Sequence, residues 1–169
     1  MQRWKSKLQV RGVIMKKVVK FGGSSLANAE QFQKVGDIIR SDESRRYVVP
    51  SAPGKRFDED IKVTDMLYGC YDAASKGEDI TEKINAIKAR YYEIIKGLGL
   101  SLSLEEEFKK IDEDFRAQAG IQYAASRGEF LNGKIMAAYL GYDFVDAATV
   151  IRFDKDGNLE AEETNKLLS

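Results

Sequence analysis

Apolar residues in the first third of the chain come in two short blocks separated by a mixed segment. Residues 16–21 (KKVVKF) and 46–50 (RYVVP) are rich in β-branched side chains, and each block ends in a turn sequence. This pattern predicts two strands, the first of them buried. Residues 28–40 repeat apolar side chains at helical spacing, and Ser25 or Asn28 can cap the predicted helix. A strand, a helix and a strand at this spacing predict a βαβ unit with parallel strands.

The middle of the chain changes to a helical period. Apolar side chains at steps of three and four residues predict helices over residues 62–74, 79–96 and 103–117. Ser103 followed by Glu106 fits a capping box for the third of these helices. We expect the last two helices to pack as an antiparallel pair that serves as scaffold.

The last third of the chain mixes both patterns. Residues 129–140 predict a helix that begins after Ser126-Arg127-Gly128 and ends before Gly141, residues 142–146 (YDFVD) predict a third strand, and residues 150–153 a possible fourth. A turn at residues 154–158 and a helix-prone polar segment follow. The pattern therefore predicts an α/β fold with a mainly parallel sheet. Because a parallel sheet usually has more strands than this, we expect the fold to be incomplete in this chain.

Length and charge narrow the choice of class. The 169 residues suit one domain, or a large piece of one, and 43% hydrophobic with 32% charged residues is a globular composition. The 27 basic and 27 acidic residues balance, which removes the electrostatic case for a nucleic-acid partner. The chain contains no histidine. That excludes a Ser-His-Asp triad, an imidazole base and any zinc site that needs histidine.

The cysteine content, the apolar runs and the N-terminal sequence indicate the expected cellular location. The single cysteine, Cys70, cannot form an internal disulfide, so we expect a reduced, cytoplasmic setting. No apolar run approaches the ~18 residues of a membrane span, so no membrane partner is expected. Residues 1–14 are basic and lack a secretory signal pattern, and Met15 directly precedes the first predicted strand. We expect residues 1–14 to be a flexible N-terminal extension and the domain to occupy residues 15–169, although an ordered arm is the alternative.

The first candidate site follows the first predicted strand, in the segment Lys20-Phe21-Gly22-Gly23-Ser24-Ser25. Two glycines at the end of a strand allow successive backbone N–H groups to surround an anion, and a helix that begins nearby adds its positive end. Lys20 would add a full charge to a phosphate site. The segment is neither a Walker loop nor a dinucleotide fingerprint, and a plain tight turn is equally consistent with it.

The second candidate site follows the second predicted strand. Ser51 and Thr64 flank a small-residue loop and offer hydroxyl groups that could hold a polar ligand above the sheet. In the structural alternative, Ser51 begins a turn and Thr64 caps a helix.

The third candidate combines Arg127 and Glu129 at the start of a predicted helix. The helix dipole favours an acidic residue there, so a structural role is possible. In a functional role, Glu129 would receive a substrate ammonium group. The acidic residues 58–60 lack metal-ligand spacing, so we predict no metal site formed by side chains.

Four segments in order resemble the aspartate kinases of the amino-acid-kinase superfamily: KFGGSS at 20–25, VVPSAPG at 48–54, KVTDML at 62–67 and SRGEFLNGKIMAAYLGYDFVDA at 126–147. The resemblance covers nearly the whole of residues 15–168. The lysine and glycines are shared by many carboxylate and carbamate kinases, whereas the last segment is much more specific to aspartate kinases. The resemblance implies a three-layer α/β/α sandwich around a largely parallel sheet.

The resemblance also implies an activity. Aspartate kinases transfer the γ-phosphoryl group of MgATP to the side-chain carboxylate of L-aspartate, the entry to lysine, threonine and methionine biosynthesis, and the full-length enzyme is expected to be a homo-oligomer. By position in the motifs, one group of residues would contact the phosphates: Lys20, Gly22, Gly23 and Ser24. A second group would hold aspartate: Ser51, Thr64 and Glu129. Arg127 would orient Glu129 or reach the carboxylate of the substrate.

The chain departs from the family in three respects. Pro50 stands where a β-branched residue is usual, and the loop at residues 55–62 is long and charged. The Arg-Gly-Gly-Ser-Asp segment of the family does not occur in these 169 residues. We therefore expect the chain to correspond to the N-terminal, aspartate-binding part and to lack phosphotransfer activity on its own. Two alternatives remain: another carboxylate or carbamate kinase, and a non-catalytic binding or assembly module.

Overall fold

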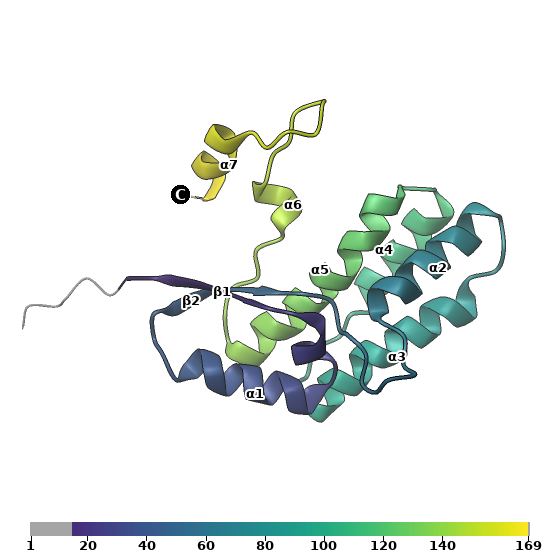
Figure 1. The fold of residues 1–169 in the computed structure, drawn as a ribbon. Helices are drawn as coiled ribbons and strands as arrows, with labels where there is room; N and C mark the ends of the chain where they lie inside the picture. The colour runs from purple at the N-terminus through teal and green to yellow at the C-terminus, as the bar shows by residue number, and fades with distance from the viewer. Residues whose placement is uncertain (1–14, 169) are drawn as a thin grey trace, which may run out of the picture.

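A computed structural model describes residues 15–168, and its N-terminal part is a βαβ unit (Figure 1). Strands β1 (Lys17–Phe21) and β2 (Arg45–Pro50) pair in parallel, with Phe21 opposite Pro50. Helix α1 (Ala29–Arg40) connects them after a short 3-10 helix, η1 (Gly23–Leu26). The predicted βαβ unit is therefore confirmed. The predicted extension at residues 1–14 lies outside the described residues.

The start of α1 is set by Asn28, one of the two predicted caps. Its side-chain carbonyl accepts a hydrogen bond from the backbone N–H of Gln31 at 3.0 Å. This bond satisfies one of the N–H groups that the first turn of a helix leaves without an intrahelical partner. The cap thereby fixes where the chain turns from the loop after β1 into the helix.

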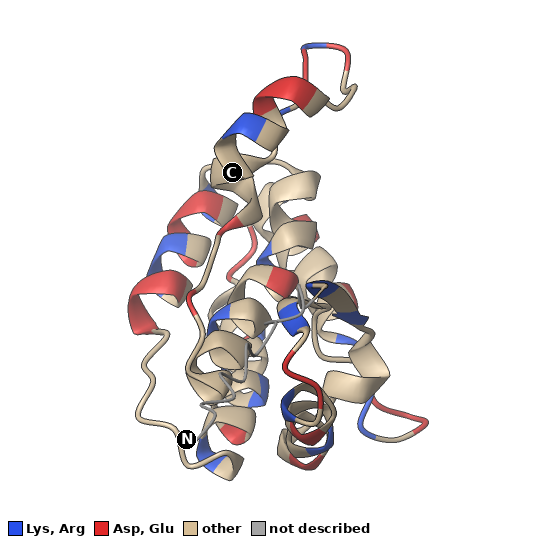
Figure 2. Ribbon diagram, turned by 90° about the vertical axis from the view of Figure 1, so that its left-hand side faces the viewer, with Lys and Arg blue, Asp and Glu red and all other residues tan. Residues whose placement is uncertain are grey.

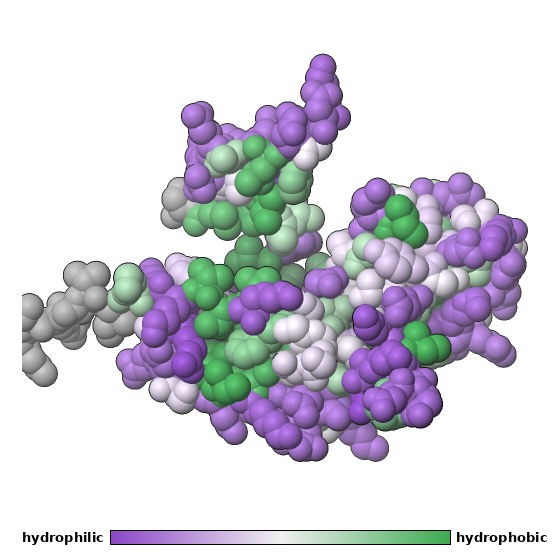
Figure 3. Space-filling view, in the orientation of Figure 1, coloured by the Kyte–Doolittle hydropathy of each residue, from purple (hydrophilic) through white to green (hydrophobic). Residues whose placement is uncertain are grey.

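The two faces of the sheet differ. Side chains on one face, Val19 and Val48 among them, pack against the core formed with the helices. On the other face, Val18, Tyr47 and Val49 are about half exposed or more, so the prediction that the first strand is buried is wrong. Apolar surface gathers over this part of the molecule in Figure 3.

Three helices follow, close to their predicted ranges: α2 (Val63–Ser75), α3 (Thr81–Gly97) and α4 (Glu105–Arg116). Their apolar positions form one core with α1 and the last long helix, and its largest fully buried side chains include Tyr91, Phe32, Phe115, Leu67, Ile87 and Ile111. Helices α3 and α4 are antiparallel, as predicted, and basic and acidic side chains alternate over the outer surfaces (Figure 2).

The predicted capping box of α4 is wrong. The N-cap residue is Leu104, one position later than predicted, and the Ser103 hydroxyl accepts only the N–H of Glu105 at 3.3 Å. Leu104 is fully buried, and anchoring it in the core sets the start of the helix. Hydrophobic burial therefore outweighs the local hydrogen bonds of the box.

The last long helix, α5 (Ile121–Leu140), begins eight residues before the predicted start. Ser126-Arg127-Gly128 therefore lies inside the helix, and the prediction that Glu129 benefits from a helix N-terminus is wrong. The break instead occurs at Gly120, whose φ of 105° suits glycine. The predicted end is confirmed, because Gly141 adopts the left-handed conformation that commonly terminates helices.

Two predicted strands are absent from the described residues. Residues 142–146 form no strand, because a strand needs hydrogen bonds from the backbone of a neighbouring strand. Among the described residues, only β1 and β2 pair, and neither pairs with this segment. Asp146 caps a short helix, α6 (Ala147–Val150), and Phe153 forms only an isolated bridge with Leu159.

The turn at residues 154–158 and a final helix, α7 (Ala161–Leu168), match the prediction. Among residues 15–168, no helix is long and apolar enough to cross a membrane. The result is a helix-rich, partial α/β fold with a two-stranded parallel sheet.

Candidate functional site

The loops that follow the two strands meet beyond their carboxyl ends. The N–H of Ser51 donates to the carbonyl of Phe21 at 3.0 Å, and the N–H of Gly54 donates to the carbonyl of Gly23 at 2.8 Å. These two bonds hold the predicted phosphate loop and the predicted substrate loop side by side. The carboxyl edge of a parallel sheet is where α/β proteins bind ligands.

Glycine is required where these loops touch. A Cβ atom on Gly23 would lie 2.8 Å from the carbonyl oxygen of Ala52, and one on Gly54 would lie 2.6 Å from the carbonyl carbon of Gly23. Both distances are too short for any side chain. By contrast, a Cβ atom on Gly22 would meet nothing within 4 Å, so its side of the loop is open to a ligand.

Helix α5 brings a carboxylate to this meeting point. Gly128 lies so close to the substrate loop that a Cβ atom there would be 2.6 Å from Ala52 Cβ. This approach places Glu129 Oε1 3.4 Å from the N–H of Ala52, which donates to it. One turn later, the fully buried Asn132 donates through Nδ2 to the carbonyl of Ser51 at 2.6 Å.

Thr64 and Glu129 open into one pocket between α2 and α5, with a volume of about 450 Å³. Its lining consists of Thr64, Tyr68, Gln122, Ala125, Ser126 and Glu129. The pocket combines a carboxylate with hydroxyl and amide groups and a half-exposed aromatic ring. Such a set can hold a small molecule that carries an ammonium group and further polar groups.

The other predicted site residues do not line this pocket. Lys20 is exposed, in the last part of β1, and Ser24 is exposed within η1. Arg127 faces away from Glu129, because residues two positions apart lie on nearly opposite sides of a helix. Its guanidinium group lies 4.4 Å from the ring centre of Tyr123 and 4.5 Å from that of Phe130, and it donates to the Ser126 hydroxyl.

Three buried polar residues that the sequence did not single out support the site. The Tyr91 hydroxyl donates to the carbonyl of Gly128 at 2.8 Å, and burial raises the pKa of this tyrosine well above its usual value. Arg90 and Asn132 bind backbone carbonyls of the loop after β2. The available signal was a polar side chain within an apolar helical stripe, since Arg90 follows Ile87 by three positions.

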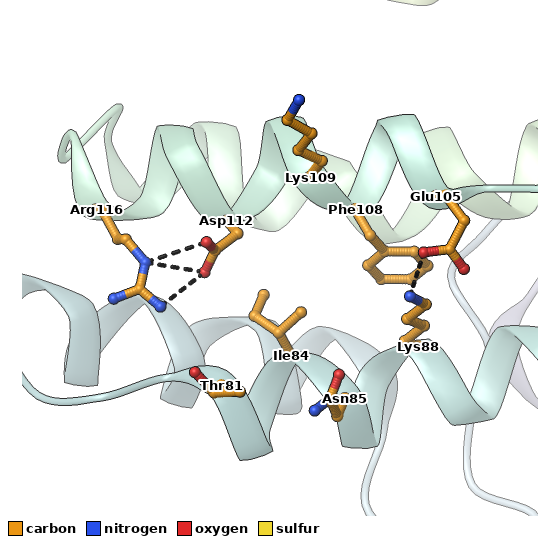
Figure 4. A pocket seen from close by; sticks show the side chains of 9 residues that line it. All are labelled: Thr81, Ile84, Asn85, Lys88, Glu105, Phe108, Lys109, Asp112 and Arg116. Atoms are coloured by element: carbon orange, nitrogen blue, oxygen red, sulfur yellow. Dashed lines mark hydrogen bonds and ion pairs between the residues drawn. The ribbon is translucent and has the colours of Figure 1, made fainter.

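A second pocket lies between α3 and α4 and has a volume of about 240 Å³ (Figure 4). Ile84 and Phe108 line it together with charged side chains, and four of these form two ion pairs: Arg116 with Asp112 and Lys88 with Glu105. Because such ion pairs are common on the surface of two packed helices, this pocket does not need a ligand to explain its charged residues. In residues 15–168, no group of three or more acidic or cysteine side chains could hold a metal ion.

Comparison with protein families and known proteins places this geometry in context. The model of the amino acid kinase family matches residues 15–169. Aspartokinase 3 of Bacillus subtilis is 39% identical over 142 residues, which cover 79% of this chain and 31% of that protein. The chloroplastic aspartokinase 1 of Arabidopsis thaliana is 30% identical over 133 residues, 73% of this chain and 23% of that protein.

Solved structures agree with the sequence relatives. The aspartate kinase of Clostridium acetobutylicum superposes with a TM-score of 0.87 at 43% identity, over 91% of this chain and 36% of that chain. Aspartokinase III of E. coli in complex with aspartate and ADP superposes with a TM-score of 0.72 at 23% identity, over 89% of this chain and 36% of that chain, and shows the fold alone. The chain thus spans between about a quarter and just over a third of the length of the relatives it matches.

Proposed function

The chain belongs to the amino acid kinase family, and from that premise we propose that it is the aspartate-binding part of an aspartate kinase. The reaction is the MgATP-dependent phosphorylation of the side-chain carboxylate of L-aspartate to 4-phospho-L-aspartate. It is the first step of lysine, threonine and methionine biosynthesis. The observation that carries the proposal is the meeting of Glu129 with the loop at residues 51–54 beside Thr64, in a chain related to two aspartokinases.

The pocket supplies complementary groups for aspartate. The Glu129 carboxylate can bind the α-ammonium group, and Thr64 can donate a hydrogen bond to a carboxylate of the substrate. Ser51 directly follows β2, and its hydroxyl group would donate a further hydrogen bond to the substrate. A pocket volume of about 450 Å³ lies within the range of small-molecule sites, which is roughly 300–1,000 Å³.

The glycine loop after β1 is the proposed phosphate site. The backbone N–H groups of Gly22 and Gly23 would donate to phosphate oxygens, the open space beside Gly22 leaves room for them, and Lys20 would neutralise charge. Ser24 would line the same space. Mg²⁺ would come with the nucleotide, since this cation is commonly held by phosphates with few protein ligands.

The chemistry suits a chain without histidine. The side-chain carboxylate of aspartate has an ordinary pKa of about 3.9 and is already ionised at neutral pH. No general base is needed to activate it. The residues of this chain would therefore act by holding the carboxylate in line with the transferring phosphoryl group and by neutralising charge.

Calorimetric titration of the 169-residue chain with L-aspartate, L-glutamate and N-acetylglutamate tests the proposal. We expect saturable binding of L-aspartate in preference to the other two, and an approximately tenfold or larger loss in E129Q because a charged partner is removed. E106Q, an exposed acidic residue in α4, serves as the matched control and should bind normally. Preference for glutamate or N-acetylglutamate would identify another carboxylate kinase, and no binding to any of them would contradict the proposal.

Two broader expectations go with this proposal. The single buried cysteine, Cys70, is compatible with a reducing, cytoplasmic setting. The full-length enzyme is proposed to be a homo-oligomer, as the family resemblance implies. Sedimentation of the full-length protein measures this directly.

A further inference from the structure

A buried guanidinium group from α3 lies beneath the loop that connects β2 to α2. Arg90 is 5% exposed, and its Nη2 atom donates to the carbonyl of Gly54 at 2.9 Å. Its Nη1 atom donates to the carbonyl of Ile61 at 3.1 Å and lies 3.0 Å from Asp60 Oδ2. One side chain therefore binds both ends of a loop whose other residues are mostly exposed.

The loop has few other anchors. Phe57 and Ile61, its two large apolar side chains, are 57% and 56% exposed, so burial of apolar surface contributes little to its order. Within the loop, Asp60 accepts hydrogen bonds from the backbone N–H and the guanidinium group of Arg56. These contacts fold the loop on itself. Arg56 also forms an ion pair with Glu93 of α3, and the N–H of Val63 donates to the carbonyl of Pro53 at 3.1 Å. Arg90 adds a buried side-chain anchor that binds both ends of the loop to the protein body.

Burying this arginine is energetically costly. Burial lowers the pKa of Arg90, and its Nε atom has no hydrogen-bond partner within the described residues. Because desolvation offsets most of the attraction within buried ion pairs, such pairs add little net stability. What the guanidinium group does supply is geometry, since its planar fork can bind two carbonyl groups in fixed directions.

The two ends of this loop lead directly into the proposed substrate pocket. Before Gly54 comes Ala52, which donates to Glu129, and after Ile61 comes the start of α2 with Thr64. We infer that Arg90 is a positioning residue that fixes the distance between these two sides of the pocket. As a statement about aspartate, this inference rests on the proposed function.

The test compares R90K with R116K in the 169-residue chain. Lysine at position 90 keeps the charge but cannot bind Gly54 and Ile61 together. We expect R90K to weaken L-aspartate binding about tenfold, the cost of losing a buried hydrogen bond, and to speed amide exchange at Arg56 and Val63. Arg116 is about half exposed in α4, and R116K should change neither quantity.

A second control separates positioning from general loss of stability. I111V removes one buried methylene group from α4, outside the loop, and should lower the melting temperature without changing the affinity for L-aspartate. If I111V weakens binding as much as R90K does, the inference is overturned. The same holds if R90K leaves both the loop exchange and the affinity unchanged.

Separate measurements apply if R90K does not fold or if the unaltered chain does not bind L-aspartate. Should R90K fail to fold, D60N removes the acidic partner of Arg90 while keeping the side-chain shape, and R56Q, which removes the other partner of Asp60, is its control. Faster loop exchange and weaker binding in D60N than in R56Q support the inference, and equal effects in the two variants overturn it. Should the unaltered chain not bind L-aspartate, the proposed function fails. Amide exchange in R90K and D60N then decides alone whether Arg90 orders the loop.

Discussion

Each of two sides of α3 carries a basic residue, but the two residues have different roles. On one side, Arg90 is buried and binds backbone carbonyls at both ends of the loop after β2. On the other, Lys88 forms an ion pair with Glu105 of α4 at the surface (Figure 4). Both sides carry a basic residue. Only the buried one has partners whose positions define the candidate site.

The comparison separates holding the helices together from shaping the pocket. Between α3 and α4, buried apolar side chains such as Ile84, Phe108 and Ile111 pack together. Ion pairs such as Lys88 with Glu105 lie at the exposed edge of this contact. Around the pocket, close backbone approaches at glycine and a few buried polar bonds set the geometry. We therefore expect core substitutions in the hairpin to change stability and substitutions near the pocket to change binding.

The largest expected effect on stability is that of F115A. Phe115 is fully buried in α4, with its ring edge-to-face against Tyr71 at 5.5 Å and against Tyr123 at 6.3 Å. Truncation of such a ring costs about 3–5 kcal/mol, through lost burial and a cavity. Denaturant unfolding measures the change. Calorimetry under folding conditions should find the affinity for L-aspartate unchanged. A loss of affinity in F115A would show that core packing and the shape of the pocket are not separate.

A pair of glycine substitutions tests the pocket side. Gly128 and Gly69 both lie inside helices, but a Cβ atom at Gly128 would be 2.6 Å from Ala52 Cβ, whereas one at Gly69 would meet nothing within 4 Å. Alanine usually stabilises a helix interior relative to glycine by up to about 1 kcal/mol. We expect that gain in G69A and a net loss of about 2 kcal/mol in G128A from overpacking.

The affinity for L-aspartate should follow the same division. In G128A the loop at Ala52 must move away from α5, which pulls its N–H away from Glu129 and weakens binding. G69A should bind normally. Equal stability and equal affinity in the two variants would mean that α5 does not hold the loop through this close approach.

Much of this fold can be predicted from local pattern. The ranges of α2, α3 and α4 follow from apolar side chains such as Leu67, Ile87 and Phe108, because a buried helical stripe repeats every three to four residues. The βαβ unit and the cap at Asn28 follow from equally local signals. The predicted meeting of Thr64 and Glu129 depended on the family resemblance, which placed both residues in one site.

What the local pattern misses depends on distant partners. The pattern places Gly128 just before a helix, but its role is set by Ala52, which lies far away in the sequence. Residues 142–146 alternate like a strand, yet strand formation requires a neighbouring strand, which the sequence does not specify. Arg90 lies within the apolar stripe of α3, but its partners at Gly54 and Ile61 cannot be identified until the loop that covers it is known.

The pH dependence of stability gives a further test of the loop after β2, through Asp60. Hydrogen bonds from Arg56, followed by weaker attraction from Arg90, hold the pKa of Asp60 well below its ordinary value, against the opposing effect of burial. A carboxyl group whose pKa is lowered by folding stabilises the protein above its unfolded pKa of about 3.9, and this contribution is lost as the pH falls toward the folded value. D60N should therefore show a shallower fall in stability below about pH 4.

Asp42 provides the matched control for this titration. Lys17 and Ser44 hold its pKa well below the ordinary value, beside the sheet and away from the pocket. D42N should likewise flatten the acid branch of the unfolding curve, but only D60N should weaken L-aspartate binding at neutral pH. Weakened binding in D42N would show that the affinity follows overall stability rather than the loop.

The smallest expected effect is that of K88Q, on the hairpin side of α3. Lys88 is 28% exposed and its partner Glu105 is 56% exposed, so water and salt screen their attraction. Glu105 also keeps a hydrogen bond from the Tyr92 hydroxyl at 2.9 Å after Lys88 is replaced. We expect the melting temperature to change by about 1 °C or less, because exposed pairs contribute little. R90K, only two positions along the same helix, should weaken L-aspartate binding while K88Q leaves it unchanged. Similar binding in these two variants would remove the distinction between the two sides of α3.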